Sequence, residues 1–227
     1  MTYVFQPPPP PVVPVAGDDA VFPVHRIYCV GRNYAAHARE MGADDREPPF
    51  FFAKPADAVV PRGGEIAYPS DTAELHHEVE LVLAIGRGGV EIPSETALDH
   101  VYGYAVGLDL TRRDRQAEAK KAGRPWDVAK GFDRSAPIGA IRPVSAGGHV
   151  RTGRIQLAVE GAVRQDGDIS DMVWSPAEII AALSRSFELA PGDLVFTGTP
   201  EGVGPLGRGQ VAAATAADLE PLLIRLV

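Results

Sequence analysis

The sequence predicts an α+β protein in which strands predominate. Short apolar runs that end at glycine or at a polar residue recur along the chain, a pattern typical of buried strands. Segments with helix signals are fewer and short. At 227 residues the chain suits one domain with a substantial core. We therefore predict a proline-rich arm over residues 1–23 and a single folded domain over residues 24–227.

Composition and charge argue against several classes of function. The formal net charge of −8 does not suit a basic surface that follows the phosphates of a nucleic acid. No apolar stretch approaches the length that spans a membrane, and prolines stand where an export signal would have its apolar segment. Cys29 is the only cysteine, which excludes an internal disulfide and favours a reducing compartment. We predict a cytoplasmic protein without a nucleic-acid or membrane partner.

The first elements are an extended arm, a strand and a short helix. Pro7 to Pro11 predict polyproline II structure, and residues 24–30 form the first clear strand. A short helix is predicted over residues 33–42, and on it His37 and Glu40 are three apart and therefore neighbours. A carboxylate beside an imidazole raises its basicity, as a water-activating base requires; the alternative is an exposed pair without a role.

Two lysines stand beside apolar segments. Lys54 ends an aromatic strand that begins at Phe50, and Lys130 lies in an irregular segment over residues 125–133. Such a lysine can extend its ammonium group to the surface, or it can meet an anion at the end of a buried strand. The sequence leaves both alternatives open for Lys54.

The stretch over residues 75–86 is the strand around which the chain is organised. Side chains alternate between the two faces of a strand, so Glu78 and Glu80 point the same way. The face they share also carries His76, Val82 and Ala84, and the other carries His77, Val79, Leu81, Leu83 and Ile85. Two carboxylates that enter a buried segment need compensation, which a divalent cation would supply; the alternative is a hydrated strand end.

A second strand and a helix follow. The strand over residues 104–108 ends in Asp109, and a helix is predicted from about residue 112 to 121, ending at Gly123. Arg113 and Gln116 are three apart on this helix and can face one ligand.

The remaining chain adds a hairpin over residues 156–164, a helix with a capping box at Ser175 and Glu178, and a strand over residues 193–196. This strand leads into a glycine-rich loop that offers the hydroxyl of Thr199. Three carboxylates without cysteine suit a hard cation such as Mg²⁺ or Mn²⁺, and the surrounding lysines and arginine suit an anionic substrate.

Six motifs in this order resemble the fumarylacetoacetate hydrolase superfamily. They are Gly31-Arg32-Asn33-Tyr34 with His37 and Glu40, Phe52-Ala53-Lys54-Pro55, His77-Glu78-Val79-Glu80-Leu81, the stretch from Asp109 to Gln116, Ala129-Lys130-Gly131-Phe132-Asp133, and Gly192-Asp193 through Gly204. They are most similar to the motifs of its bacterial fumarylpyruvate and acylpyruvate hydrolases. The tail after Leu206 lies outside the match.

The resemblance implies a mixed β-sandwich roll with a few flanking helices and a short lid helix, assembled as a homodimer, with residues 24–227 as the catalytic domain. It implies that Glu78, Glu80 and Asp109 bind Mg²⁺ or Mn²⁺ and that His37 and Glu40 form a catalytic dyad on the lid. Lys54 would stabilise the oxyanion. The substrate contacts would come from Arg113, Gln116, Lys130 and Thr199.

The expected reaction is hydrolysis of a 2,4-diketo acid, fumarylpyruvate to fumarate and pyruvate, in aromatic-acid (gentisate-type) degradation. Oxaloacetate decarboxylation and 2-hydroxyhepta-2,4-diene-1,7-dioate isomerisation are the alternatives, because the same metal site can serve both.

Overall fold

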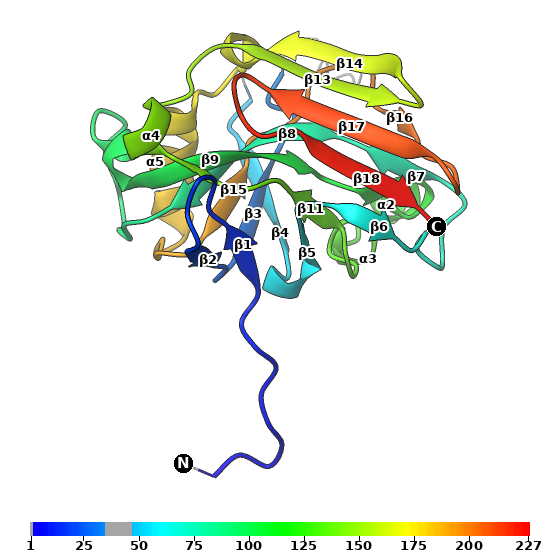
Figure 1. The fold of residues 1–227 in the computed structure, drawn as a ribbon, viewed down its shortest axis with the longest axis horizontal. Coiled ribbons are helices and arrows are strands. Elements are labelled where there is room, and N and C mark those ends of the chain that lie inside the picture. Colours follow the sequence, from blue (N-terminus) through cyan, green and yellow to red (C-terminus); the bar gives the residue numbers. More distant parts are fainter. Residues whose placement is uncertain (1, 35–46) are drawn as a thin grey trace.

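The computed structural model describes residues 2–34 and 47–227 and consists mainly of strands (Figure 1). This confirms the predicted fold class. The predicted lid helix with His37 and Glu40 lies outside the described residues.

The strands of the described residues form two larger sheets and two small ones. The eight-stranded sheet has the order β4 (Phe50–Lys54), β3 (Ile27–Gly31), β15 (Leu194–Phe196), β8 (Val79–Ile85), β9 (Val101–Leu108), β11 (Ala136–Ile138) and β5 (Val59–Pro61), with β12 (Arg142–Pro143) paired to β9. The five-stranded sheet has the order β14 (Ala162–Asp168), β13 (Arg154–Val159), β17 (Val211–Ala216), β18 (Leu222–Leu226) and β6 (Gly64–Ile66). The small sheets are β10 (Thr111–Arg112), β7 (Leu75–His77) and β16 (Gly204–Pro205), and the hairpin β1 (Val12–Pro14) and β2 (Val21–Pro23).

Strand β8 contributes to two separate hydrophobic clusters, as its alternating pattern predicts. Leu81 and Leu83 pack in the larger cluster with side chains of β13, β17 and β18. Val82 and Ala84 pack on the opposite face with residues of β3 and of the β1–β2 hairpin. In Figure 1 the five-stranded sheet lies over the β8–β9 region, so that the larger cluster fills the space between the two layers.

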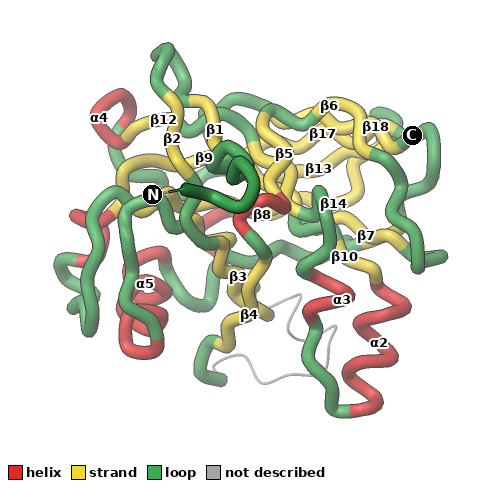
Figure 2. Tube along the Cα trace, turned by 90° about the horizontal axis from the view of Figure 1, so that it is seen from below, coloured by secondary structure: helices red, strands yellow, loops and turns green. Residues whose placement is uncertain are grey.

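The described residues contain few helices. They are α2 (Arg113–Ala122), α3 (Asp127–Lys130), α4 (Val144–Gly147) and α5 (Pro176–Ser186), with 3₁₀ turns η1 (Ala56–Ala58), η2 (Ala97–His100) and η3 (Ile169–Asp171). Helix α2 ends at Gly123, whose φ of 61° only glycine adopts without strain, and α5 has the predicted capping box. Where the sequence predicts an irregular segment, α3 forms one helical turn. Figure 2 shows α2 and α3 side by side, with β3 and β4 lying between them and α5.

Two terminal segments differ from the prediction. The apolar side chains of Val13, Val15 and Phe22 are buried in the core, because β1 and β2 pair and pack on the eight-stranded sheet. The extended part of the N-terminal segment therefore ends near Pro11, well before residue 23. The tail after Leu206, to which the sequence assigns no element, supplies β17 and β18 to the five-stranded sheet. No helix among the described residues is long and apolar enough to cross a membrane.

Candidate metal centre and active site

Three acidic side chains from two strands meet in one buried cluster, called here the carboxylate triad: Glu78, Glu80 and Asp109. One carboxylate oxygen of each lies within 4.8 Å of the others. The antiparallel register of β8 and β9 pairs Val79 with Leu108, so that Glu78 and Asp109 extend from neighbouring strand ends. The Asp109 N–H donates to the Glu78 carbonyl oxygen at 2.9 Å. All three side chains are buried, which makes their charges costly without partners.

Three cations compensate the triad. Lys130 Nζ lies 2.7 Å from Glu78 Oε2 and 2.6 Å from Asp109 Oδ2. Arg113 donates to Glu78 Oε1, and Lys54 Nζ lies 2.8 Å from Asp109 Oδ1. Glu80 has no ion pair among the described residues; its Oε2 accepts the Gly198 N–H at 2.7 Å.

The pKa values follow this asymmetry. Burial alone would raise the pKa of Glu78, but the charges of Lys130 and Arg113 outweigh it and hold this pKa below its usual range. The pKa of Glu80 is raised well above its usual value, first by burial and then by the negative charges of Asp109 and Glu78. Glu80 is therefore the member of the triad without a cation of its own.

A divalent metal ion fits this site. It would place positive charge beside Glu80, and the donor set consists of oxygens only, which hard cations such as Mg²⁺ and Mn²⁺ prefer. The carboxylates also line a cavity, so the site can admit a ligand.

Lys54 lies beside one member of the triad. Its ammonium group is buried and contacts Asp109 Oδ1, the Leu110 carbonyl oxygen at 3.2 Å and the Lys130 carbonyl oxygen. It is absent from the side chains that line the cavity. Two of its N–H groups donate to these carbonyl oxygens, and its charge lies beside Asp109. We therefore propose that Lys54 holds Asp109 in position, and its catalytic role stays a prediction.

The predicted substrate contacts do line the cavity: Arg113, Gln116, Lys130 and Thr199. Arg113 Nη1 donates to Gln116 Oε1 at 2.5 Å, which leaves the Gln116 amide N–H groups as donors. The Thr199 hydroxyl donates to the Val79 carbonyl oxygen and accepts from Gln165 Nε2, each at 2.8 Å. Thr199 is therefore held rigidly and keeps one lone pair for a further hydrogen bond.

Sequence reasoning missed part of the cavity wall. Arg32 and Lys120 line it together with three aromatic residues, Phe50, Phe52 and Trp126. A signal was present for both: Arg32 belongs to one of the recognised motifs, and Lys120 lies four residues after Gln116, on the helix face predicted to meet a ligand. His37 and Glu40 lie outside the described residues, and their role stays a prediction.

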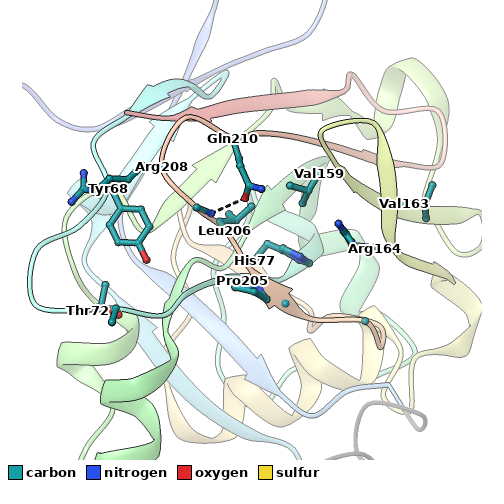
Figure 3. Close-up of a pocket in the computed structure, with 14 residues that line it drawn as sticks. Tyr68, Thr72, His77, Val159, Val163, Arg164, Pro205, Leu206, Arg208 and Gln210 are labelled. Carbon is teal, nitrogen blue, oxygen red and sulfur yellow. Dashed lines mark hydrogen bonds between the residues drawn. The ribbon is translucent and has the colours of Figure 1, made fainter.

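A second, larger groove is lined by residues of β7, β13, β14 and β16 (Figure 3). His77 and Arg164 line it, and none of the described carboxylates does. The imidazole of His77 is hydrogen-bonded through Nδ1 to Gln165 Oε1 at 2.9 Å, and burial lowers its pKa. Without an acidic group this groove offers no metal centre, so we place the chemistry at the triad.

Comparison with known proteins fits this site. A model of the family fumarylacetoacetate (FAA) hydrolase C-terminal matches residues 26–222. The chain belongs to the fumarylacetoacetate hydrolase family. A similar solved structure is fumarylpyruvate hydrolase from Pseudomonas aeruginosa in complex with Mn²⁺ and pyruvate, which is 56% identical with a TM-score of 0.97. The match covers 100% of this chain and 99% of that one.

Two curated relatives carry another activity in their names. Mitochondrial oxaloacetate tautomerase FAHD1 of Arabidopsis thaliana is 43% identical over 189 residues, which are 83% of this chain and 85% of the relative. Oxaloacetate tautomerase YcgM of Escherichia coli K12 is 42% identical over 195 residues, 86% of this chain and 89% of the relative. The family is therefore certain, and the reaction has to be argued from the site.

Proposed function

We propose that the protein is a metal-dependent hydrolase that cleaves the carbon–carbon bond of a 2,4-diketo acid, with fumarylpyruvate as the preferred substrate. The observation that carries the proposal is the buried carboxylate triad in a cavity whose other charged side chains, among the described residues, are all cationic. Such a cavity suits a small dianion that reaches a metal ion. The likeness over the full chain to a hydrolase in complex with Mn²⁺ and pyruvate supports this choice of reaction.

The carboxylate triad would hold Mg²⁺ or Mn²⁺. When bound, the ion withdraws the negative charge that develops on the keto-acid oxygens during cleavage. Arg113 and the amide of Gln116 would orient the keto-acid carboxylate, with Lys130 and Thr199 as further donors and acceptors along the same wall. Lys54 contributes indirectly, by fixing Asp109.

The hydrolytic step needs a base. In the proposal His37, oriented by Glu40, takes a proton from water while the water oxygen bonds to the C4 carbonyl carbon. The C3–C4 bond then breaks, its electron pair remains on C3 as the enolate of pyruvate, and a proton on C3 gives pyruvate. The acyl fragment leaves as fumarate. We expect His37→Ala to lower turnover by about 10²–10⁴-fold and to leave the affinity for oxalate nearly unchanged.

Proton transfer on oxaloacetate is the second candidate, supported by the two oxaloacetate tautomerases among the relatives. Oxaloacetate decarboxylation and 2-hydroxyhepta-2,4-diene-1,7-dioate isomerisation belong to the same group of alternatives. None of these reactions requires an attacking water, so the products separate them from hydrolysis.

The deciding experiment measures pyruvate release from fumarylpyruvate and from acetylpyruvate, with Mg²⁺ or Mn²⁺ and again with EDTA. Metal-dependent release that favours fumarylpyruvate supports the hydrolase. The enol–keto interconversion of oxaloacetate is measured by absorbance. If the protein catalyses it and releases pyruvate from neither diketo acid, the hydrolase is refuted in favour of the tautomerase.

The proposal includes a cytoplasmic homodimer that acts in gentisate-type aromatic-acid degradation, with residues 24–227 as the catalytic domain. A light-scattering mass of two chains is the expected result, and a mass of one chain at micromolar concentration contradicts the dimer.

A further inference from the structure

The cavity contains two cations that the carboxylate triad does not require. Lys54, Arg113 and Lys130 already provide three positive charges for the three carboxylates. Arg32 and Lys120 line the same cavity and contact none of the triad within salt-bridge distance. Among the described residues Lys120 has no ion pair at all. A divalent metal ion would increase this positive surplus further, so that the described residues leave the cavity short of negative charge.

Arg32 is held at the cavity by its backbone. Its φ of 59° lies in the left-handed region, which a long side chain adopts only when its surroundings impose it. The side chain of Asn33 imposes it here, by donating to the carbonyl oxygens of Trp174 and Thr197 and accepting the Trp174 N–H.

The guanidinium group of Arg32 has hydrogen-bonding capacity that the described residues do not satisfy. Its Nε is buried and has no hydrogen-bond partner in the described part of the chain. Its Nη1 lies 3.9 Å from the carboxylate of Glu47, which is 62% exposed, and so loose a pair contributes little. A buried donor without a partner costs free energy, so a ligand that supplies an acceptor removes this cost and binds more tightly.

Lys120 extends the cationic wall away from the metal centre. One face of helix α2 lines the cavity. Its residues follow the helical spacing of three and four positions: Arg113, Gln116 and Lys120. The seven steps from Arg113 to Lys120 correspond to about 10 Å of helix rise. Burial, followed by the charges of Arg113 and Arg32, lowers the pKa of Lys120, which places the two surplus cations within each other's field.

Aromatic rings join the two cations into one surface. The Arg32 guanidinium carbon lies 5.7 Å from the centre of the Phe50 ring, and Lys120 Nζ lies 5.2 Å from that of Trp126. The two rings meet edge to face at 5.5 Å. A cation packed on a ring has fewer water molecules around it and keeps its remaining N–H groups for an anion.

We propose that Arg32 and Lys120 form a subsite for a second carboxylate, the one at the far end of the acyl group of a diketo acid. The subsite rests on the proposed function, because that function places the keto-acid end at the carboxylate triad. It makes the enzyme selective for acylpyruvates whose acyl group is itself an acid over those whose acyl group ends in a methyl.

A binding experiment tests the subsite without turnover. Calorimetry in the presence of Mn²⁺ compares 2-oxopimelate, which has a carboxylate at both ends, with 2-oxoheptanoate, which lacks the distal one. We expect the wild type to bind 2-oxopimelate at least tenfold more tightly, and Arg32→Gln and Lys120→Gln each to remove about tenfold of that preference. The matched control is Lys121→Gln, which removes an exposed lysine next to Lys120 on the same helix and should change neither affinity.

Equal affinity of the wild type for the two acids overturns the subsite. So does an equal loss of affinity for both acids in the two variants. Because Arg32 has a constrained backbone, Arg32→Lys is added as a variant that keeps the charge; Lys120→Gln changes only an exposed helix position and should fold normally.

Kinetics with fumarylpyruvate and crotonylpyruvate, in which a methyl replaces the distal carboxylate, separate the two proposals. If neither compound is cleaved, the hydrolase is refuted, and the calorimetry still decides the subsite. If both are cleaved, the subsite predicts a KM about tenfold higher for fumarylpyruvate in Lys120→Gln, with kcat for both compounds and KM for crotonylpyruvate unchanged. An equal change for both compounds contradicts it.

Discussion

Replacing Lys54 by methionine tests whether this lysine supports the metal centre or acts on the substrate. The side chain is buried, and its ammonium group contacts Asp109 Oδ1 and the carbonyl oxygens of Leu110 and Lys130. Methionine fills a similar volume but removes the charge and all three donors. Asp109 would keep only Lys130 as its ion-pair partner.

The magnitude follows from these contacts. Breaking a buried ion pair by removing one partner costs about 3–5 kcal/mol, because the other charge is left without compensation. The loss includes the two carbonyl oxygens, whose contributions do not add fully to that of the pair. Against a typical total stability of about 5–15 kcal/mol, Lys54→Met should remain folded but be clearly weakened.

Urea unfolding in EDTA is the assay, with the exposed Lys121→Met as control. We expect the free energy of unfolding of Lys54→Met to fall by about 3–5 kcal/mol in EDTA and by less in Mn²⁺, because the ion supplies Asp109 with positive charge. Combining it with Asp109→Asn should recover part of the loss, since the pair is then removed together. Unchanged stability with a turnover reduced by 10²–10³-fold would refute the argument and return Lys54 to an oxyanion-binding role, for which losses of about that size are known.

Three further predictions concern other parts of the chain. Glu80→Gln should raise the free energy of unfolding in EDTA by about 1 kcal/mol, because it removes a buried carboxylate that lies beside two others. The same variant should weaken Mn²⁺ binding at least tenfold by calorimetry. A lower free energy of unfolding in EDTA contradicts the first expectation. Asn33→Ala should cost about 2–3 kcal/mol in urea unfolding, because it removes the hydrogen bonds that the Asn33 amide donates to the carbonyl oxygens of Trp174 and Thr197, whereas a loss below about 0.5 kcal/mol would count against the network. Burial and the charge of Arg151 lower the pKa of His149, so that below about pH 6.5 the unfolded chain binds more protons than the folded one. This contribution to stability is lost as the pH falls from about 6.5 through the folded-state pKa. His149→Gln should therefore flatten the pH dependence of the free energy of unfolding in that window, and an unchanged slope argues against it.

Local patterns in the sequence were sufficient for much of the fold. The alternation along residues 79–85 predicts which side chains of β8 enter each core cluster, because neighbouring side chains on a strand always point to opposite faces. The capping box at Ser175 and Glu178 and the glycine after α2 mark helix ends for a similar reason, since their hydrogen bonds close within four residues. The same alternation places Glu78 and Glu80 on one face, and so predicts two of the three triad members from a single strand.

Contacts between distant residues were decided by the tertiary structure. The register of β8 against β9 brings Asp109 to Glu78, and the sequence alone allowed Lys54 to be a surface charge, an oxyanion donor or a partner of Asp109. The structure places the Lys54 ammonium group beside the buried Asp109 carboxylate, and we propose that compensating this charge is its role, because an uncompensated charge in the interior is costly.

The strands β17 and β18 are likewise a tertiary result. Alanine-rich residues 211–216 have weak intrinsic strand preference and become a strand by pairing with β13 and β18. The two surplus cations, Arg32 and Lys120, are likewise brought to the cavity by tertiary packing. Lys120 shares the face of α2 that carries Arg113 and Gln116, and the packing of this face brings Lys120 rather than Lys121 to the cavity wall. The sequence by itself thus determined that Glu78 and Glu80 share one face of a strand. The folded chain decided which cations line the cavity beside them, because helix and strand packing sets the direction of each side chain.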